Sequence, residues 1–317
     1  IRGRGGAAVI GAAWKVPFQP AGAVTVRGAD ILPELDSRAY LGGHCSLGAF
    51  AVPEYEAWSV LGKTLRYSVD LSAAGCGCSA SLVLTEMRHN ADMTACSDFF
   101  CDATASCGVS CDEVVIQRSN ANTWESLLRL AGDPVGSGGR VGHDYGPGAA
   151  CIDTNAPFEV AASFPVDADD GAVLAMEVRL FQPRTRCALA ARIGRDTFQE
   201  PGAFLQMSEA LQGGMTVAIS YSRTATQCSG SAPAVCGQSV VIGNFSWENY
   251  VPTAGTGEAA NASLSRATTL RSTAAADATA ARTAARTATR TSTWTTTRTT
   301  TRTATTTATT TATTTAT

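Results

Sequence analysis

The chain has 317 residues, a formal net charge of −3 and 11 cysteines. This length fits one large domain or two, and no apolar run approaches the roughly 18 residues that suggest a membrane-spanning helix. After Pro252 the sequence is almost wholly Thr, Ala and Arg, a composition that cannot bury enough apolar surface to fold. We therefore predict a folded domain over residues 1–252 and a disordered low-complexity tail or linker over 253–317. That tail is either a glycosylated stalk or an extension without a role.

Charge is divided unevenly between these two parts. Seven of the 24 Lys and Arg residues, but only two of the 27 Asp and Glu residues, lie after Pro252, which leaves 17 basic against 25 acidic residues before it. The folded region is therefore acidic. This disfavours nucleic-acid binding by that region, because recognition of the phosphate backbone depends on positive charge.

Alternating apolar residues predict half-buried antiparallel strands in several windows. Four clear examples are Leu65–Leu71, Phe158–Phe164, Leu174–Leu180 and Met215–Tyr221. A short helix is expected from about Gly202 to Leu211, closed by the glycine pair that follows it. Trp58 and Trp247 lie in strand-like runs, and we expect both in the core. These elements indicate an all-β domain.

One further strand-like run, Cys111–Asn120, carries an isolated carboxylate among apolar neighbours. Strict alternation puts Glu113 and Val115 on one face of this strand and Arg118 on the other. A carboxylate between aliphatic residues is costly to bury unless it has a partner or a function. On this pattern alone, Glu113 is either an exposed residue on the wet face of a sheet or half of a catalytic pair.

Four segments follow one another in an order that is familiar from a known enzyme family. They are Ser59–Leu71 with Cys76 after it, the run Cys111–Asn120, Tyr145–Gly148 with Ile152–Thr154, and Gly213–Ser220. These segments resemble glycoside hydrolase family 7, the cellobiohydrolases and endoglucanases of cellulose breakdown. The family's catalytic strand reads Cys-Ser-Glu-x-Asp-x-Trp-Glu-Ala-Asn. The resemblance implies a concanavalin-like jelly-roll β-sandwich with its cleft on the concave face, here an open groove because the roofing loops are shortened or missing.

In that family the first Glu is the nucleophile, the Asp two residues later supports it, and the second Glu is the acid/base. The resemblance places the nucleophile at Glu113, but the supporting position is Val115 and the acid/base position is Arg118. A guanidinium keeps its proton at physiological pH, and losing a positioned general acid lowers the rate by on the order of 10²- to 10⁴-fold. An arginine close to Glu113 would also favour its ionised form. Glu125, in the pair Trp124-Glu125, is a substitute acid if the loop is realigned.

Other substrate-binding positions of the family are replaced as well. Ser222 and Arg223 stand where the family has the Trp-Asp of a sugar platform, and Arg88 and Asn90 replace the acids of a Met-Asp-x-Asp segment. Two hypotheses follow. The first is a secreted retaining hydrolase of β-1,4-glucan (cellulose) with impaired catalysis. The second is a non-catalytic carbohydrate-binding protein for anionic polysaccharide, recognised by arginines at 88, 118 and 223, so the sequence leaves open whether the chain is an enzyme.

The cysteine content is typical of secreted domains. The family resemblance implies that Cys96 and Cys101 pair with Cys111 and Cys107, and Cys76 with Cys228. A zinc site is the alternative for the first four cysteines, although their spacing lacks a close Cys-x-x-Cys pair. We expect an extracellular monomer whose partner is a polysaccharide, with no cofactor and no metal. Because the chain starts at Ile1 without a methionine, this localisation rests on the cysteines and on the resemblance.

Overall fold

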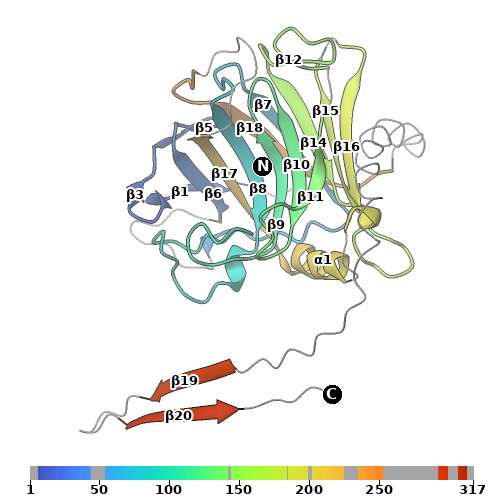
Figure 1. Cartoon of the computed structure of the whole chain (residues 1–317). Coiled ribbons are helices and arrows are strands. Elements are labelled where there is room, and N and C mark those ends of the chain that lie inside the picture. The colour runs from blue at the N-terminus through green and yellow to red at the C-terminus, as the bar shows by residue number, and fades with distance from the viewer. Residues whose placement is uncertain are drawn as a thin grey trace, which may run out of the picture. The chain divides into compact units, whose positions relative to one another are not determined.

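The structure, a computed structural model, describes residues 6–43, 54–141, 144–183, 185–198, 202–224 and 235–252, together with the backbone of two strands in the tail (Figure 1). The chain divides into two compact units, Ile1–Ala260 and Asn261–Thr317. Within the described residues, no helix is long and apolar enough to cross a membrane.

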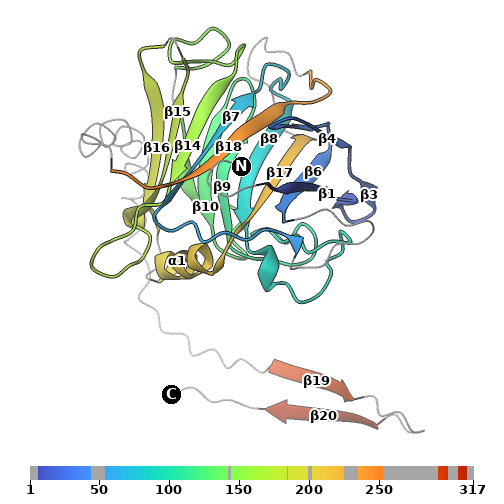
Figure 2. The ribbon, with the colours of Figure 1, turned by 180° about the vertical axis from the view of Figure 1, so that it is seen from behind.

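The first unit contains two seven-stranded antiparallel sheets (Figures 1 and 2). The first sheet has the order β1 (Ala8–Gly11), β6 (Ser37–Gly42), β17 (Thr216–Arg223), β8 (Cys78–Thr85), β9 (Glu113–Ser119), β10 (Trp124–Arg129) and β11 (Ser137–Arg140). The second has the order β16 (Ala188–Gly194), β15 (Ala175–Phe181), β14 (Phe158–Ser163), β7 (Lys63–Asp70), β18 (Val241–Asn249), β5 (Asp30–Pro33) and β4 (Val24–Arg27).

Short elements complete the first unit. They are the pair β2 (Trp14–Val16) and β3 (Gln19–Pro20), the pair β12 (Tyr145–Gly146) and β13 (Ile152–Asp153), the helix α1 (Ala203–Gly213), and the 3-10 turns η2 (Met87–His89) and η3 (Arg195–Thr197). Helix α1 lies where the sequence predicts one. It is followed by Gly214, whose φ of +114° is a conformation that glycine adopts without steric cost.

The core lies between the two sheets and is built from the alternate residues of their strands. Leu65 and Val69 on β7 and Leu82 on β8 are fully buried in it. Trp58 and Trp247 belong to the same cluster and pack edge to face with their ring centroids 5.2 Å apart. The predicted sandwich of antiparallel strands and the core position of both tryptophans are confirmed.

Strand β9 departs from strict alternation in its middle. Its register against β8 shifts between Leu82 and Val83, and its register against β10 shifts at the same level, so that Ile116 is an extra residue. Such a β-bulge resets which side chains share a face. Gln117 therefore turns into the core, where its side-chain oxygen accepts a hydrogen bond from the Tyr67 hydroxyl at 2.9 Å.

This bulge brings the two charged residues of β9 together. Glu113, Val115 and Arg118 all line one cavity on the outer face of the first sheet. The prediction that Glu113 and Arg118 lie on opposite faces is wrong, because one additional residue between them reverses the alternation for the second half of the strand.

The disulfides differ in part from the implied pairing. Cys96 bonds Cys107 and Cys101 bonds Cys111, so the expected partners are exchanged. The reason is local: the backbone N–H of Cys111 donates to the carbonyl oxygen of Asp102 at 3.2 Å, which brings Cys111 beside Cys101, with their Cα atoms 5.6 Å apart. Because all four sulfurs are bonded in pairs, they do not form the alternative zinc site.

Two further disulfides join Cys78 to Cys236 and Cys151 to Cys187. Cys76 is also disulfide-bonded. Its predicted partner, Cys228, lies outside the described residues.

The second unit contains strands β19 (Ser292–Arg298) and β20 (Thr306–Ala312), which pair antiparallel with each other. An isolated two-stranded hairpin is at best marginally stable in water. The expectation that the tail has no packed core therefore stays a prediction.

Candidate active site

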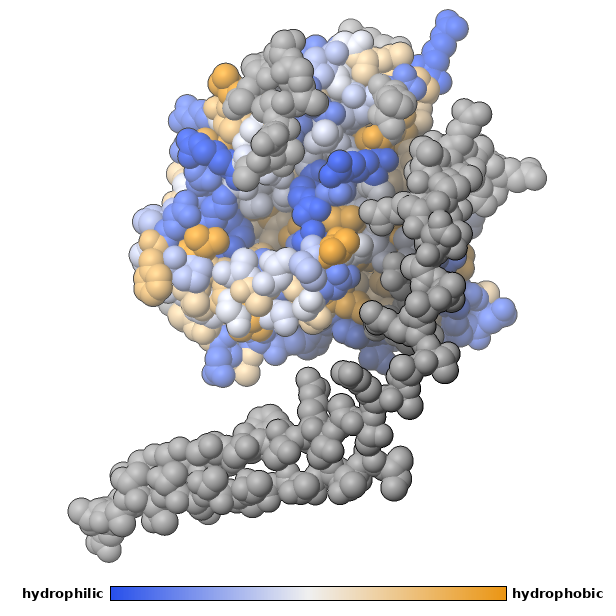
Figure 3. All heavy atoms as spheres, viewed as in Figure 1, coloured by the Kyte–Doolittle hydropathy of each residue, from blue (hydrophilic) through white to orange (hydrophobic). Residues whose placement is uncertain are grey.

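A cavity of about 270 Å³ lies on the outer face of the first sheet. Strands β6, β8, β9, β10 and β17 form its floor, and the loop 100–106 and β2 border it. Its charged lining residues are Lys15, Arg38, Asp102, Glu113, Arg118 and Arg129. Figure 3 shows a hollow on the corresponding face of the molecule, with hydrophilic residues along its border.

Glu113 and Arg129 face each other on neighbouring strands at one side of this cavity. Their side chains are buried, with residue exposures of 7% and 8%, and Arg129 Nη1 lies 3.6 Å from Glu113 Oε2. Neither Glu113 Oε2 nor Arg129 Nε has a hydrogen-bond partner. Buried polar atoms without partners are rare in folded proteins, so this pair is the least satisfied polar part of the cavity wall.

The protonation of Glu113 is set by opposing influences. Burial raises the pKa of its carboxyl group above the ordinary value of 4.5, and the nearby charge of Asp102 raises it further. The Arg129 guanidinium, the backbone N–H of Ala103 and the Arg118 guanidinium lower the pKa, but burial outweighs them. Glu113 is therefore a carboxyl group whose charge depends on its cationic neighbours.

Arg118 is held by a carboxylate from the next strand. Its Nε and Nη2 donate to Glu125 Oε2 at 2.8 and 2.5 Å. The other oxygen of Glu125 accepts from Arg140 Nε at 3.4 Å. With both oxygens on guanidinium groups, Glu125 is the counterion of Arg118, and this arrangement does not suit a proton donor.

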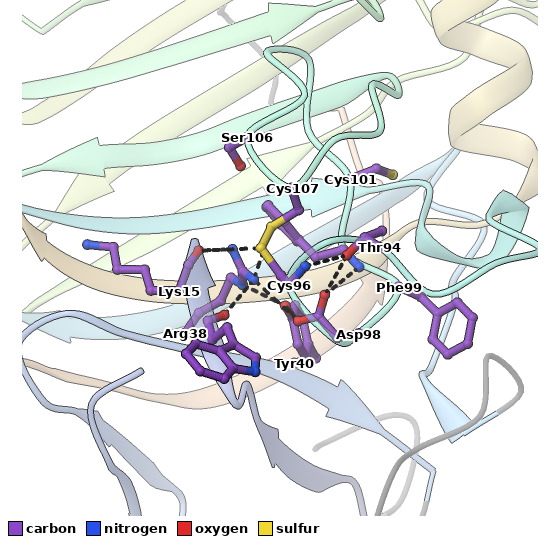
Figure 4. A network of polar contacts seen from close by, with 12 residues as sticks. Lys15, Arg38, Tyr40, Thr94, Cys96, Asp98, Phe99, Cys101, Ser106 and Cys107 are labelled. Carbon is purple, nitrogen blue, oxygen red and sulfur yellow. Dashed lines mark hydrogen bonds and ion pairs between the residues drawn. A yellow bond between two sulfur atoms is a disulfide. The ribbon is translucent and has the colours of Figure 1, made fainter. Parts of the chain in front are cut away.

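A buried polar network fixes the loop that borders the cavity (Figure 4). Arg38 on β6 donates to the carbonyl oxygen of Lys15 at 2.8 Å and to Asp98 Oδ2 at 3.3 Å. The Tyr40 hydroxyl donates to the same Asp98 oxygen at 2.6 Å. The Arg38 guanidinium also lies 3.9 Å from the ring centroid of Phe100, within the range of a cation–π contact.

The other predicted site residues lie elsewhere. Arg88 is exposed on η2, and Asn90 Nδ2 donates to the carbonyl oxygen of Phe99 at 2.7 Å. Ser222 and Arg223 end β17, where Arg223 pairs with Asp36 at 2.6 Å. None of these four predicted residues lines the cavity, whose lining is described above.

Trp124 also lies away from the cavity. Its indole is buried in the core, and Nε1 donates to Ser126 Oγ at 3.1 Å. It therefore presents no face on which a sugar ring could stack.

Sequence reasoning missed four of the charged lining residues, namely Lys15, Arg38, Asp102 and Arg129. One signal was available for Asp102, because it follows directly after Cys101 in the cysteine cluster. Arg129 reaches the site through the pairing of β10 with β9, which no local pattern reveals.

A larger cavity of about 540 Å³ is lined by residues of β1, β4, β5, β7 and β18, among them Val26, Tyr67 and Phe245. It contains none of the predicted site residues. The smaller cavity is therefore the better candidate, because size alone does not supply the chemical groups of a site.

No protein-family model matches the chain. It is 29% identical over 205 residues to endoglucanase EG-1 of Hypocrea jecorina, an alignment that covers 53% of this chain and 44% of that protein. Endoglucanase EG-1 of Trichoderma longibrachiatum is 29% identical over 203 residues, with the same coverage of 53% and 44%. The chain thus spans less than half the length of these curated relatives.

Solved structures of cellulases also superpose on this chain. The endocellulase EGI of Humicola insolens superposes with a TM-score of 0.55 at 19% identity, covering 71% of this chain and 77% of that one. A family 7 cellobiohydrolase of Daphnia pulex superposes with a TM-score of 0.52 at 16% identity, covering 71% and 80%. At these identities the likeness shows a shared fold, the predicted jelly-roll sandwich.

Proposed function

We propose that this chain, a divergent member of glycoside hydrolase family 7, binds a β-1,4-glucan across the outer face of its first sheet and hydrolyses it weakly. The observation that supports this most directly is the composition of the cavity. Glu113 is present at the nucleophile position, while Arg118, bound to Glu125, takes the place of the proton donor. The disulfides support the further proposal that the protein works outside the cell.

The first chemical step needs two groups. Glu113 attacks the anomeric carbon, and the departing sugar oxygen needs a proton from a second carboxylic acid roughly 5 Å away. Arg118 can donate a hydrogen bond to that oxygen but cannot transfer a proton. The step is then slowed by on the order of 10²- to 10⁴-fold for ordinary sugars. It should stay feasible where the leaving group needs no proton.

The surroundings of Glu113 fit a weak nucleophile. Its Oε2 is buried and has no hydrogen-bond partner. Arg129 at 3.6 Å favours the charged form that attacks, but the same attraction lowers the nucleophilicity of the carboxylate. The residue can therefore form a glycosyl ester, at a rate below that of a carboxylate without an adjacent cation.

A non-catalytic role in binding anionic polysaccharide is the second candidate. Arg118 and Arg129 in the cavity, and the Nε of Arg129 without a partner, favour it. The charge balance argues against it, because the lining cations already face carboxylates: Lys15 faces Asp36, Arg38 faces Asp98, Arg118 faces Glu125 and Arg129 faces Glu113. An uncharged glucan therefore fits this site better.

A fluorosugar derived from cellobiose, with dinitrophenolate as its leaving group, tests the proposal. We expect mass spectrometry to find one cellobiosyl adduct on the protein, mapped to the peptide that contains Glu113. The variant E113Q should form none, while the matched control E159Q, on the exposed face of β14, should label like the wild type. No adduct on the wild type, together with measurable binding to sulfated or uronic glycans, would favour the second candidate.

A further inference from the structure

A second carboxylate, Asp102, faces the same cavity as Glu113. The chain brings the two together through a covalent link, because Cys101, directly before Asp102, is bonded to Cys111, two residues before Glu113. The backbone supports this link: the N–H of Cys111 donates to the carbonyl oxygen of Asp102 at 3.2 Å. Asp102 is thus fixed beside the start of β9.

Four donors hold the Asp102 carboxylate in place. Oδ1 accepts from the backbone N–H and hydroxyl of Thr104, both at 3.0 Å, and from the backbone N–H of Ser106 at 2.9 Å. Oδ2 accepts from the Ser106 hydroxyl. A carboxylate oxygen has two lone pairs, so Oδ2 keeps one that is free to accept a proton.

Asp102 and Glu113 line the same cavity, and the residue after Asp102 contacts the Glu113 carboxyl group. The charge of Asp102 raises the pKa of Glu113, and the N–H of Ala103, the next residue along, lowers it through a hydrogen bond. The cavity that they share, about 270 Å³, has room for roughly nine water molecules at ~30 Å³ each. A water molecule can therefore lie between Asp102 and an intermediate on Glu113.

We propose that Asp102 is the general base for the second half of the reaction, the hydrolysis of the cellobiosyl ester on Glu113; this rests on the proposed function. The oxygen of a water molecule attacks the anomeric carbon, and the bond from that carbon to the Glu113 oxygen breaks with its electron pair returning to the carboxylate. The proton of the water passes to Asp102 Oδ2 and then to solvent. In the family this task belongs to the residue at the position of Arg118, and a protonated guanidinium cannot accept the proton of the water.

The same geometry explains why Asp102 does not replace the missing acid. Asp102 is the acceptor in all four of these hydrogen bonds, so its carboxylate oxygens are placed to receive a proton rather than to donate one. The site therefore contains a base for the second step and no acid for the first. Turnover should be slow for glucans and should depend on Asp102 only when the first step is made easy.

The test is the kinetics of dinitrophenyl cellobioside on the full chain. We expect D102N to keep the initial burst of dinitrophenolate, and to lower the steady rate by on the order of 10²-fold, so that the cellobiosyl ester accumulates. Azide, which needs no base, should restore the steady rate of D102N and give a cellobiosyl azide with retained anomeric configuration.

Two control variants separate this role from a structural one. D112N makes the same change at the next loop carboxylate, whose Oδ1 accepts from Ala131 N and Gln206 Nε2, and it should leave the kinetics unchanged. S106A removes the donor to Asp102 Oδ2 but keeps the charge, and should keep the steady rate within a few-fold. In D102N the amide oxygen preserves the acceptor of three bonds, so the fold should persist, which its unfolding curve checks.

The outcomes distinguish the two proposals. A normal burst in D102N with an unchanged steady rate, or a failure of azide to restore a lowered rate, would overturn the role of Asp102 and leave the nucleophile in place. The absence of any adduct on wild-type Glu113 would overturn the proposed function, and the role of Asp102 with it.

Discussion

The pair of Glu113 and Arg129 makes a testable prediction about stability. Both side chains are 9% exposed, and the nearest nitrogen and oxygen are 3.6 Å apart. Removing one member of a buried pair leaves an uncompensated charge, which costs about 3 to 5 kcal/mol. We expect R129M to lose about 3 kcal/mol near pH 8, the lower end of this range, because the two groups make no hydrogen bond.

The loss should depend on pH, and its sign follows from the proton balance. Without Arg129, burial holds the folded pKa of Glu113 above the unfolded value of about 4.3. Between these two values the native state binds more protons than the unfolded state, so stability falls as pH rises. The destabilisation of R129M should therefore be small near pH 4 and complete above the folded pKa.

Urea unfolding of the wild type and R129M near pH 4 and pH 8 measures this difference. R140M, which removes a guanidinium that is 75% exposed, is the matched control and should cost only about 0 to 1 kcal/mol at either pH. The double variant E113Q/R129M should recover most of the loss. An equal loss at both pH values, or no recovery in the double variant, would refute the electrostatic reasoning.

Two further predictions concern the site. Hydrolysis of an activated cellobioside should fall as pH falls through a pKa above 4.5, because burial raises the pKa of the attacking Glu113 carboxyl group. R129Q removes a cation that lowers this pKa, so it should move the acid limb of the pH–rate profile to higher pH. Comparing the pH–rate profiles of the wild type and R129Q tests this prediction. The variant C101S/C111S should unfold about 3 kcal/mol more easily and should also lose steady turnover, because Asp102 is no longer fixed; equal turnover would contradict the second part. The matched controls outside the cavity are R140Q for the first and C151S/C187S for the second.

Regular patterns in the sequence predict the sandwich well. Strands β7, β14, β15 and β17 lie where apolar residues alternate, since one face of each strand is buried against the opposite sheet. Helix α1 was expected from a short apolar segment closed by two glycines. These elements follow from local periodicity, which can be recognised in the sequence without knowledge of the tertiary structure.

The site is less predictable, because its groups are brought together by irregular structure. The bulge at Ile116 has no glycine or proline beside it, yet it decides that Arg118 shares a face with Glu113. Asp102 and Arg129 reach the cavity through a folded loop and a neighbouring strand. The exchanged disulfide partners have the same origin, since pairing depends on how the loop folds back.

The dependence of the first chemical step on the leaving group tests the central claim most directly. We predict that wild-type kcat/KM for a series of aryl cellobiosides falls steeply as the pKa of the leaving group rises, because no residue at position 118 can supply a proton. In R118E the dependence should be shallow, with a gain on the order of 10²-fold for the poorest leaving groups. A shallow dependence in the wild-type protein would contradict the account, since a proton donor would then already be at work.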